Sequence, residues 1–503
     1  MIFFIFLLSK RMNSPKAQLT RNLSLLGLTA TGICSMIGAS IYVVPFMIQR
    51  NVTGIGPYVL PAFLFAAIPA LFAALAYAIL ATAMPRAGGS YLYASRSLNP
   101  YLGFVASFSQ WFGLSIVIGV IAYVIVPFFR DFFAALGWED LAAQLEIGWI
   151  RVTISIGVLW VFVWINIRGV KLYEKTLIPL MILMFGLGAV VIISGLSFDQ
   201  SDFAKALLEK EGGSIPIIEN NFDWSIFLTA STLLFSSFIG FDSIAQAGGE
   251  AKNPTKNLPK AIGLAIFGVG LFYILFSFAV YHAVPWEFVA AEAMNKDVTA
   301  AGLLSYVLPS SLGVLILFGA AIALLNDLPA MILSVSRLIF SWAEDGIFAK
   351  RFSSIHPVHH TPHRAILLSG AMATLGILGS HFAGDFFLGI DIMVTSMLVN
   401  FLLMSISLLF LPKRNAELAS KITIFKSAIA QKLIAYCGIV SLSSFLIIHT
   451  LKDLRAEVSA WYFHSTPVWL IVMAGASIFF IFRWKKLQQS GINTQERFST
   501  LPD

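Results

Sequence analysis

Charged residues are scarce in this chain. Only 12% of its 503 residues are Asp, Glu, Lys or Arg, whereas 58% are hydrophobic. In a soluble domain about a quarter of the residues are charged, so this composition leaves too little polar surface to cover a water-soluble fold. The apolar residues come in blocks of about 20, the length that crosses a bilayer core of about 30 Å. The composition therefore predicts a polytopic membrane protein.

Several other features are missing. The chain has only two cysteines, Cys34 and Cys437, which excludes a disulfide framework. It has no ATP-binding loop of the G-x-x-x-x-G-K-[ST] type, no nucleophile elbow and no zincin motif, so we predict neither an enzyme nor an ATP-driven pump. Four histidines stand in the loop IHPVHHTPHR, but metal sites need ligands on rigid elements. We therefore predict no metal site and no bound cofactor.

Twelve apolar segments are present, and each predicts a helix, because backbone polar groups in lipid must be satisfied within their own segment. A transmembrane barrel would need short alternating segments instead. The chain is thus predicted to be an all-α integral membrane protein. Its predicted spans are residues 23–49, 56–84, 101–129, 148–167, 175–197, 224–247, 259–284, 308–343, 364–382, 386–411, 427–450 and 464–483.

The loop charges predict the orientation. If the N-terminus is cytoplasmic, the inside segments carry 25 of the 33 Lys and Arg residues and the outside segments carry 8. This bias predicts that the protein lies in a cell membrane with both termini in the cytoplasm. It also explains the net charge of +7 without a nucleic-acid partner. The first run, MIFFIFLLSK, is too short to span and lacks a signal-peptide cleavage site. We hypothesise that translation begins at Met12, with Met1 as the alternative.

Two spans carry small and hydroxyl residues at mid-depth, where these residues weaken a helix. The first is span 1, at Gly38–Ser40, and the second is span 6, at Ser236–Gly240. Each would be the first helix of a half with five spans, so the second half would enter the membrane from the opposite side. Interrupted helices at matching places in two inverted halves indicate a transporter site. The alternative is that these small residues only let helices pack closely.

Four motifs in order resemble the amino acid–polyamine–organocation permease superfamily. They are GICSMIGASIYVVP in span 1, AMPRAGGSYLYASRSLNPYLGF between spans 2 and 3, FIGFDSIAQAGGEAKNPTKNLPKAI from span 6 to span 7, and SRLIFSWAEDGIFAKRF with HTPHRAI after span 8. Each motif stands at the matching helix end, and the resemblance covers spans 1 to 10. It implies a secondary transporter, mostly of amino acids and in some members of amines, driven by protons, by sodium or by exchange.

The resemblance also implies the architecture. A core of ten helices at 23–412 would consist of two inverted repeats of five, 23–197 and 224–412, with discontinuous helices 1 and 6. Two peripheral helices would follow at 413–486. The tails at 1–22 and 487–503 would be cytoplasmic.

The chain departs from the family pattern at four places. Ser40 replaces the second glycine of the span-1 break, and Ile79 replaces a frequent glutamate of span 2. Gly249-Glu250 replaces a frequent acidic pair after span 6. Met184 stands where some members carry a lysine that substitutes for sodium. These departures bear on the coupling ion more than on the fold.

A broken helix exposes backbone groups that match an amino acid. The N–H groups at the start of a half-helix suit a carboxylate, and the freed carbonyls at the opposing half-helix end suit an ammonium. The family binds its substrate between helices 1 and 6, with helices 3 and 8 beside it. Phe235 is a candidate gate, and the predicted substrate-binding residues are Met36, Gly38, Ala39, Ser40, Trp111, Ser236, Ser237, Phe238, Ile239 and Gly240.

The candidate ion-coupling residues are polar side chains inside the spans. Asp242 is the ionisable residue nearest the span-6 break and is a proton-carrying candidate, because intramembrane acids are costly and mark ion pathways. Ser334 in span 8 is a candidate for a sodium ion, although membrane serines are often packing residues. Asn326, Asp327 and Asp391 either face an aqueous path or tie helices together.

Span 3 predicts the substrate class. Its sequence SQWFGLSIVIGVIAYVIVPFF carries no charge, so a cationic substrate would be left without a partner there, whereas an apolar side chain gains about 0.8 kcal/mol per buried CH₂. We therefore predict a symporter or exchanger of neutral amino acids. The alternatives are an amine or polyamine carrier, or a non-transporting sensor or channel on the same fold. The expected partners are the amino acid and the lipid bilayer, with the oligomeric state open.

Overall fold

The computed structural model describes residues 18–38, 40–383, 386–458 and 460–502. Within these ranges all regular secondary structure is helical, apart from two isolated β-bridges, Leu23–Ala251 and Ala87–Ala247. Twelve helical segments of the described chain are long and apolar enough to cross a membrane. The predictions of an all-helical fold and of twelve spans are therefore confirmed.

Ten of the spans are single helices. They are α4 (Val59–Ala83), α6 (Pro100–Ala135), α8 (Gly148–Ile167), α9 (Val170–Ser197), α13 (Pro254–Ala283), α16 (Ser310–Glu344), α17 (His363–Ala383), α18 (Phe386–Arg414), α20 (Ala428–Arg455) and α21 (Ser465–Gln489). The other two are broken. Span 1 consists of α2 (Leu25–Met36) and α3 (Ser40–Asn51), and span 6 of α11 (Trp224–Leu234), the 3₁₀ turn η2 (Phe235–Phe238) and α12 (Asp242–Gln246).

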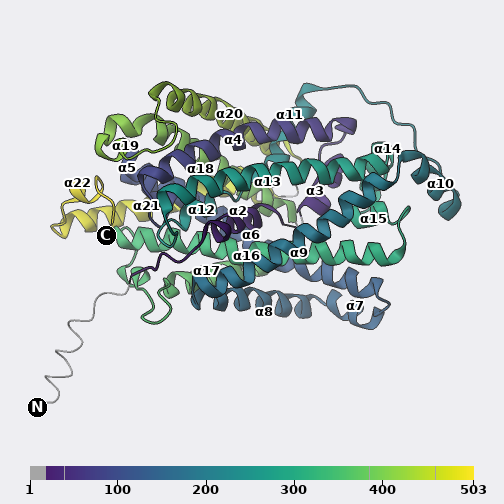
Figure 1. Ribbon diagram of the computed structural model, residues 1–503, viewed down its shortest axis with the longest axis horizontal. Coiled ribbons are helices and arrows are strands. Elements are labelled where there is room, and N and C mark those ends of the chain that lie inside the picture. The colour runs from purple at the N-terminus through teal and green to yellow at the C-terminus, as the bar shows by residue number, and fades with distance from the viewer. Residues whose placement is uncertain (1–17, 39, 384–385, 459, 503) are drawn as a thin grey trace, which may run out of the picture.

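Short helices cap the two ends of the bundle. They are η1 (Gly56–Tyr58), α5 (Gly89–Ser97), α7 (Glu139–Glu146), α10 (Gln200–Glu211), α14 (Trp286–Asn295), α15 (Ala300–Leu304), η3 (Lys350–Ser353), α19 (Ala416–Ser420), η4 (Trp461–Phe463) and α22 (Thr494–Arg497). Figure 1 shows α5, α19, α22 and the C-terminus at one end, with α7, α10, α14 and α15 at the other. The charge bias predicts that the first end is cytoplasmic.

Burial sorts the spans into centre and periphery. In span 1, 94% of the most apolar 18-residue window is buried, whereas in α21 the share is 28%. Helix α6 packs along α16, α17 and α18, while α13 packs against α2, α4 and α9. Helix α16 also contacts both α2 and α12, so span 8 links span 3 to the broken spans 1 and 6 in the interior. The inverted relation between the two halves stays a prediction.

Candidate functional site

Span 1 is interrupted where the sequence indicated. Helix α2 ends at Met36, Ile37 has an extended backbone with φ −93° and ψ 94°, and α3 begins at Ser40. Gly38 forms a bend between the two halves. Ala39 lies outside the described residues, and of Ser40 the structure describes the backbone only. The Ile37 N–H still donates to the Ile33 carbonyl at 2.8 Å, so the carbonyls that follow Ile33 in α2 are the ones at the helix end, where backbone groups lack intrahelical partners.

Span 6 is interrupted over a longer stretch. After the 3₁₀ turn η2, Ile239 is extended with φ −79° and ψ 128°, and Gly240 has φ 139°. That positive φ is a conformation that glycine adopts readily and other residues avoid. Helix α12 then resumes at Asp242 and is only five residues long. Five of the predicted substrate-binding residues, Ser236 to Gly240, thus lie in this break.

The two breaks cross in contact with each other. A Cβ atom at Gly240 would overlap the backbone carbonyl of Ser35, so the span-6 break packs directly on span 1. Ser243 follows Gly240 by three residues, and its hydroxyl is hydrogen-bonded to the Ser35 hydroxyl at 2.9 Å. The freed carbonyl of Met36 accepts a hydrogen bond of 2.9 Å from the Tyr273 hydroxyl of α13.

A cavity of about 510 Å³ lies beside the crossing point, within the size range of small-molecule sites. Its inner part is lined by Ser35 and Met36 from span 1, by Ser236 and Ile239 from span 6, and by Asp327 of α16. Its walls are mostly apolar, and they consist of Val43, Met47, Val117, Val120, Ile121, Val124, Pro127, Phe128, Leu324, Met331, Ile390 and Met393.

The cavity leads toward the end of the bundle that carries α7 and α14. Its outer lining includes Arg130, Asp131, Arg151, Asp297 and Thr299. Most of these charges are paired at the surface, because Arg130 contacts Asp131 and Glu146 while Arg50 contacts Asp297 at 2.7 Å. The site is therefore a mostly apolar chamber that reaches one face of the membrane domain.

Comparison with known proteins decides the family. A family model described as amino acid permease matches residues 23–476, which is most of the chain. The chain belongs to the amino acid permease family. It is thus a multi-pass membrane transporter rather than an enzyme.

Curated relatives of this permease differ in what they carry. It is 26% identical to the branched-chain amino acid permease BcaP of Bacillus subtilis, over 73% of this chain and 76% of that protein. It is 24% identical to the low-affinity putrescine importer PlaP of Escherichia coli, over 77% and 79%. It is 28% identical to the cationic amino acid transporter 4 of Mus musculus, over 73% of this chain and 56% of that protein.

Several predicted site residues of the permease are not among the described residues that line the cavity. Trp111 packs on Trp342 with ring centroids 5.8 Å apart, and it borders a separate apolar groove between α6, α17 and α18. Phe235 packs against Phe401 and Phe445, away from the cavity lining. Phe238 packs between Phe63 and Tyr273, and Ser237 is buried behind the break.

The two ion-coupling candidates are both buried outside the cavity lining. The carboxylate of Asp242 accepts a hydrogen bond from Gln110 of α6. Gln110 belongs to a buried polar network with Ser90, Gln246, Tyr77 and Asn400, in which the Ser90 hydroxyl donates to Gln110 at 2.6 Å. Ser334 is fully buried in α16, and its hydroxyl has no hydrogen-bond partner within the described part of the chain.

Asp327 is the acidic residue that borders the cavity beside the breaks. The sequence leaves open whether Asp327 faces an aqueous path or ties helices together, although an acid inside a membrane helix is by default a functional candidate. The signal that was available is its position near the middle of span 8, the helix that the family places beside the substrate. What the sequence did not show is that Asp327 and Gly38 meet across two helices.

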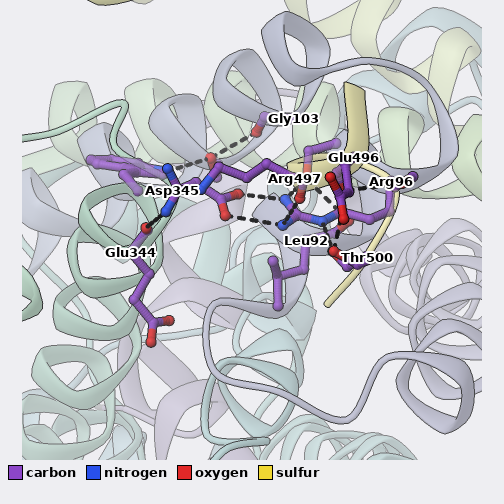
Figure 2. A network of polar contacts seen from close by, with 12 residues as sticks. Leu92, Arg96, Gly103, Glu344, Asp345, Glu496, Arg497 and Thr500 are labelled. Atoms are coloured by element: carbon purple, nitrogen blue, oxygen red, sulfur yellow. Dashed lines mark hydrogen bonds and ion pairs between the residues drawn. The ribbon is translucent and has the colours of Figure 1, made fainter. Parts of the chain in front are cut away.

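The end of the bundle that carries α5 and α22 is closed by buried ion pairs. Arg337 of α16 donates to both oxygens of Glu250, at 2.9 and 2.7 Å. Arg96 contacts both oxygens of Asp345 and also donates to the backbone carbonyls of Arg497 and Thr500. Figure 2 shows Arg96 held between Asp345 and the C-terminal segment.

The Arg96 pair lies outside the spans and keeps its charge. Burial acts to lower the pKa of the Arg96 guanidinium, but the adjacent Asp345 carboxylate outweighs it and leaves that pKa above its ordinary value. The charges at this end therefore compensate one another, whereas the cavity opens toward the opposite end.

Proposed function

We propose that this permease is a secondary active transporter of neutral amino acids that works by alternating access, as a symporter or an exchanger. The observation that carries the proposal is a chamber bounded by both broken helices and by the apolar stretch of α6 from Val117 to Phe128. Such a chamber suits a small zwitterion whose side chain is apolar, because apolar burial is favourable and an unpaired cation would be costly there.

The two ends of the substrate are assigned from the freed backbone groups. We assign the ammonium to carbonyls near Met36 and to Ser236 and Ile239, which line the inner cavity. We assign the carboxylate to the start of α3, at Gly38 to Ser40, where the dipole of the half-helix favours an anion. The side chain then lies against α6, beside Val117 and Ile121.

The direction of access follows from the charge bias. We propose that the permease resides in the cell membrane with both termini cytoplasmic, so that the cavity opens to the outside. The end of the bundle with the Arg96–Asp345 and Arg337–Glu250 pairs is then the closed cytoplasmic side. We propose a proton as the coupling ion, with sodium as the rival.

An amine or cationic amino acid is the second candidate substrate. The observation in its favour is Asp327, a carboxylate in the cavity wall. The names of the relatives cover both classes, since one is a branched-chain amino acid permease, one a putrescine importer and one a cationic amino acid transporter.

The test is a competition experiment on the purified full-length permease in proteoliposomes, in which the displacement of a bound neutral amino acid tracer is measured. Leucine, alanine and phenylalanine should each displace a bound neutral tracer better than arginine or putrescine. If arginine or putrescine competes best, the neutral amino acid proposal is wrong and the amine or cationic substrate takes its place.

A further inference from the structure

Asp327 is an acid inside the membrane domain that forms no ion pair with any residue the structure describes. Its side chain is 4% exposed, and it borders the cavity together with Met36 and Met331. Its Oδ1 atom is buried without a hydrogen bond, and among the described residues no Lys, Arg or His forms an ion pair with it. A carboxylate that is buried in this way needs a positive charge beside it or a proton on it.

Asp327 lies directly beside the span-1 break. A Cβ atom at Gly38 would overlap Oδ2 of Asp327, so the carboxylate occupies the space where a side chain of residue 38 would lie. The half-helix α3 begins two residues later, and its N-terminus favours an anion. An internal carboxylate therefore already lies next to the place assigned to the substrate carboxylate.

The charges in the closed site must then balance. A neutral amino acid carries one positive and one negative charge, so with an ionised Asp327 the occupied site would hold a net charge of −1. Once water is excluded, two neighbouring carboxylates cannot both stay ionised against one ammonium, because like charges in a common site favour protonation of one of them. One additional positive charge has to enter together with a neutral substrate.

We propose that Asp327 takes up one proton from the outside with each neutral amino acid and releases it to the cytoplasm. This proposal rests on the proposed function. The proton binds to a carboxylate oxygen of Asp327, which then donates a hydrogen bond to the substrate carboxylate instead of repelling it. A proton needs only this one oxygen, whereas a metal cation in a dry site needs several oxygens to replace its hydration shell.

The other titratable and charged groups around the cavity are engaged elsewhere or are not acids. From α2, Cys34 is the thiol that interacts electrostatically with Asp327, and α9 presents the uncharged Met184 to Asn326. Asp242 of α12 is turned to Gln110. The remaining charged groups that α6 and α8 bring to the cavity are those at its outer part, Arg130, Asp131 and Arg151.

The experiment measures the charge that moves with each leucine. Proteoliposomes with the full-length permease receive an outside-acid pH gradient or, in a separate arm, an inward sodium gradient at equal pH, and leucine uptake and charge movement are recorded together. The wild type should accumulate leucine with the pH gradient, with one positive charge per leucine, and should ignore the sodium gradient. This ratio needs no variant, so it tests the proposal even if a variant fails to fold.

The isosteric variant Asp327→Asn then assigns the proton to this residue. The asparagine amide fills the same space beside Gly38 as the carboxylate does, but it cannot take up or release a proton. We expect its leucine binding to be independent of pH, and its gradient-driven accumulation to fall at least tenfold more than its leucine–leucine exchange. Asp242→Asn serves as the rival variant and should keep the ratio of one charge per leucine.

The outcomes separate the two proposals. If no neutral amino acid is taken up under any ion gradient or in exchange for internal leucine, the proposed function is wrong. If leucine is taken up without charge movement, or with a sodium gradient alone, or if Asp327→Asn still accumulates leucine with one charge each, the assignment to Asp327 is wrong while the proposed function stands. The assignment to Asp327 is also wrong if Asp242→Asn loses the charge movement with leucine while Asp327→Asn keeps it.

Discussion

Helix α16 carries two kinds of buried charge. Toward its C-terminal end, Arg337 is paired with Glu250, and Asp345, just beyond the helix, is paired with Arg96, with all four side chains at most 3% exposed. Near its middle, Asp327 is almost as deeply buried, but it forms no ion pair among the described residues and its Oδ1 atom has no hydrogen bond there. The same helix thus contributes to a closed, compensated region and to an open, uncompensated one.

This difference separates a region that stabilises the protein, the paired charges, from a region that serves transport, the cavity. A buried pair that satisfies its own hydrogen bonds holds segments together, and removing one partner leaves the other uncompensated. A buried acid without a partner contributes no such bond and persists at a cost, as functional sites often do. We therefore expect variants of the paired region to affect folding and variants of the cavity to affect transport.

The largest expected effect is in the paired region. Arg337→Met leaves Glu250 buried without its partner and should destabilise the protein by about 3–5 kcal/mol. The double variant Arg337→Met with Glu250→Met should recover most of that loss. Thermal unfolding of the purified protein in detergent measures both, and Asp327→Asn, measured alongside, should be no less stable than the wild type. A single variant as stable as the wild type would show that this pair does not hold the region closed.

The next effect concerns the cavity. Val117 lines the chamber on α6, and Val117→Phe should fill part of it and lower leucine uptake at least tenfold, about 1.4 kcal/mol of apparent binding, without loss of thermal stability. The matched control is Leu375→Phe, which adds a ring in the lipid-facing groove outside the cavity. Equal uptake by the two variants would contradict the placement of the site.

A smaller effect is expected where the C-terminal segment covers Arg96. The Phe498 ring lies 5.2 Å from the guanidinium carbon of Arg96 and packs on Trp484. Phe498→Ala should therefore lower stability by about 1–2 kcal/mol, measured by thermal unfolding. Ile492→Ala, at an exposed position nearby, is the control and should leave the unfolding temperature unchanged. If both variants match the wild type, the segment does not stabilise the paired region.

Cysteine labelling tests on which side of the membrane each region lies, and the two substitutions are expected to change neither stability nor transport. In a background lacking the native cysteines, Ser201→Cys on α10 should react with a membrane-impermeant thiol reagent in intact cells. Gln495→Cys on α22 should react only after permeabilisation. The reverse pattern would place the cavity mouth in the cytoplasm and overturn the predicted orientation.

Much of the fold follows from the sequence, because the requirement to satisfy backbone groups in lipid leaves helices as the solution for each apolar block. The predicted spans 148–167 and 175–197 correspond closely to α8 and α9. The short helices outside the membrane were not predicted, although α10 carries a capping box at Asp199 and Asp202 and a terminating Gly212. Its signals are local, and α10 is a polar helix that contains no long apolar run of the kind that indicates a membrane span.

The candidate site was predictable where it depends on backbone conformation. Small residues at Gly38 and Gly240 indicated the two breaks, and both breaks are present. Side-chain positions were harder to predict, because they depend on which face of each helix turns inward. Trp111 and Val117 both lie on α6, less than two turns apart, yet only Val117 is among the described residues of the cavity wall.

The central claim is that the chamber between the broken helices binds the substrate. Ser236 lines it and is partly accessible, while its neighbour Ser237 is buried behind the break. In an uptake-competent background with Cys34 and Cys437 replaced by alanine, Ser236→Cys should react from the outside with an impermeant thiol reagent, and saturating leucine should slow that reaction at least tenfold. Ser237→Cys should not react. Reaction of Ser236→Cys at the same rate with and without leucine would contradict the claim.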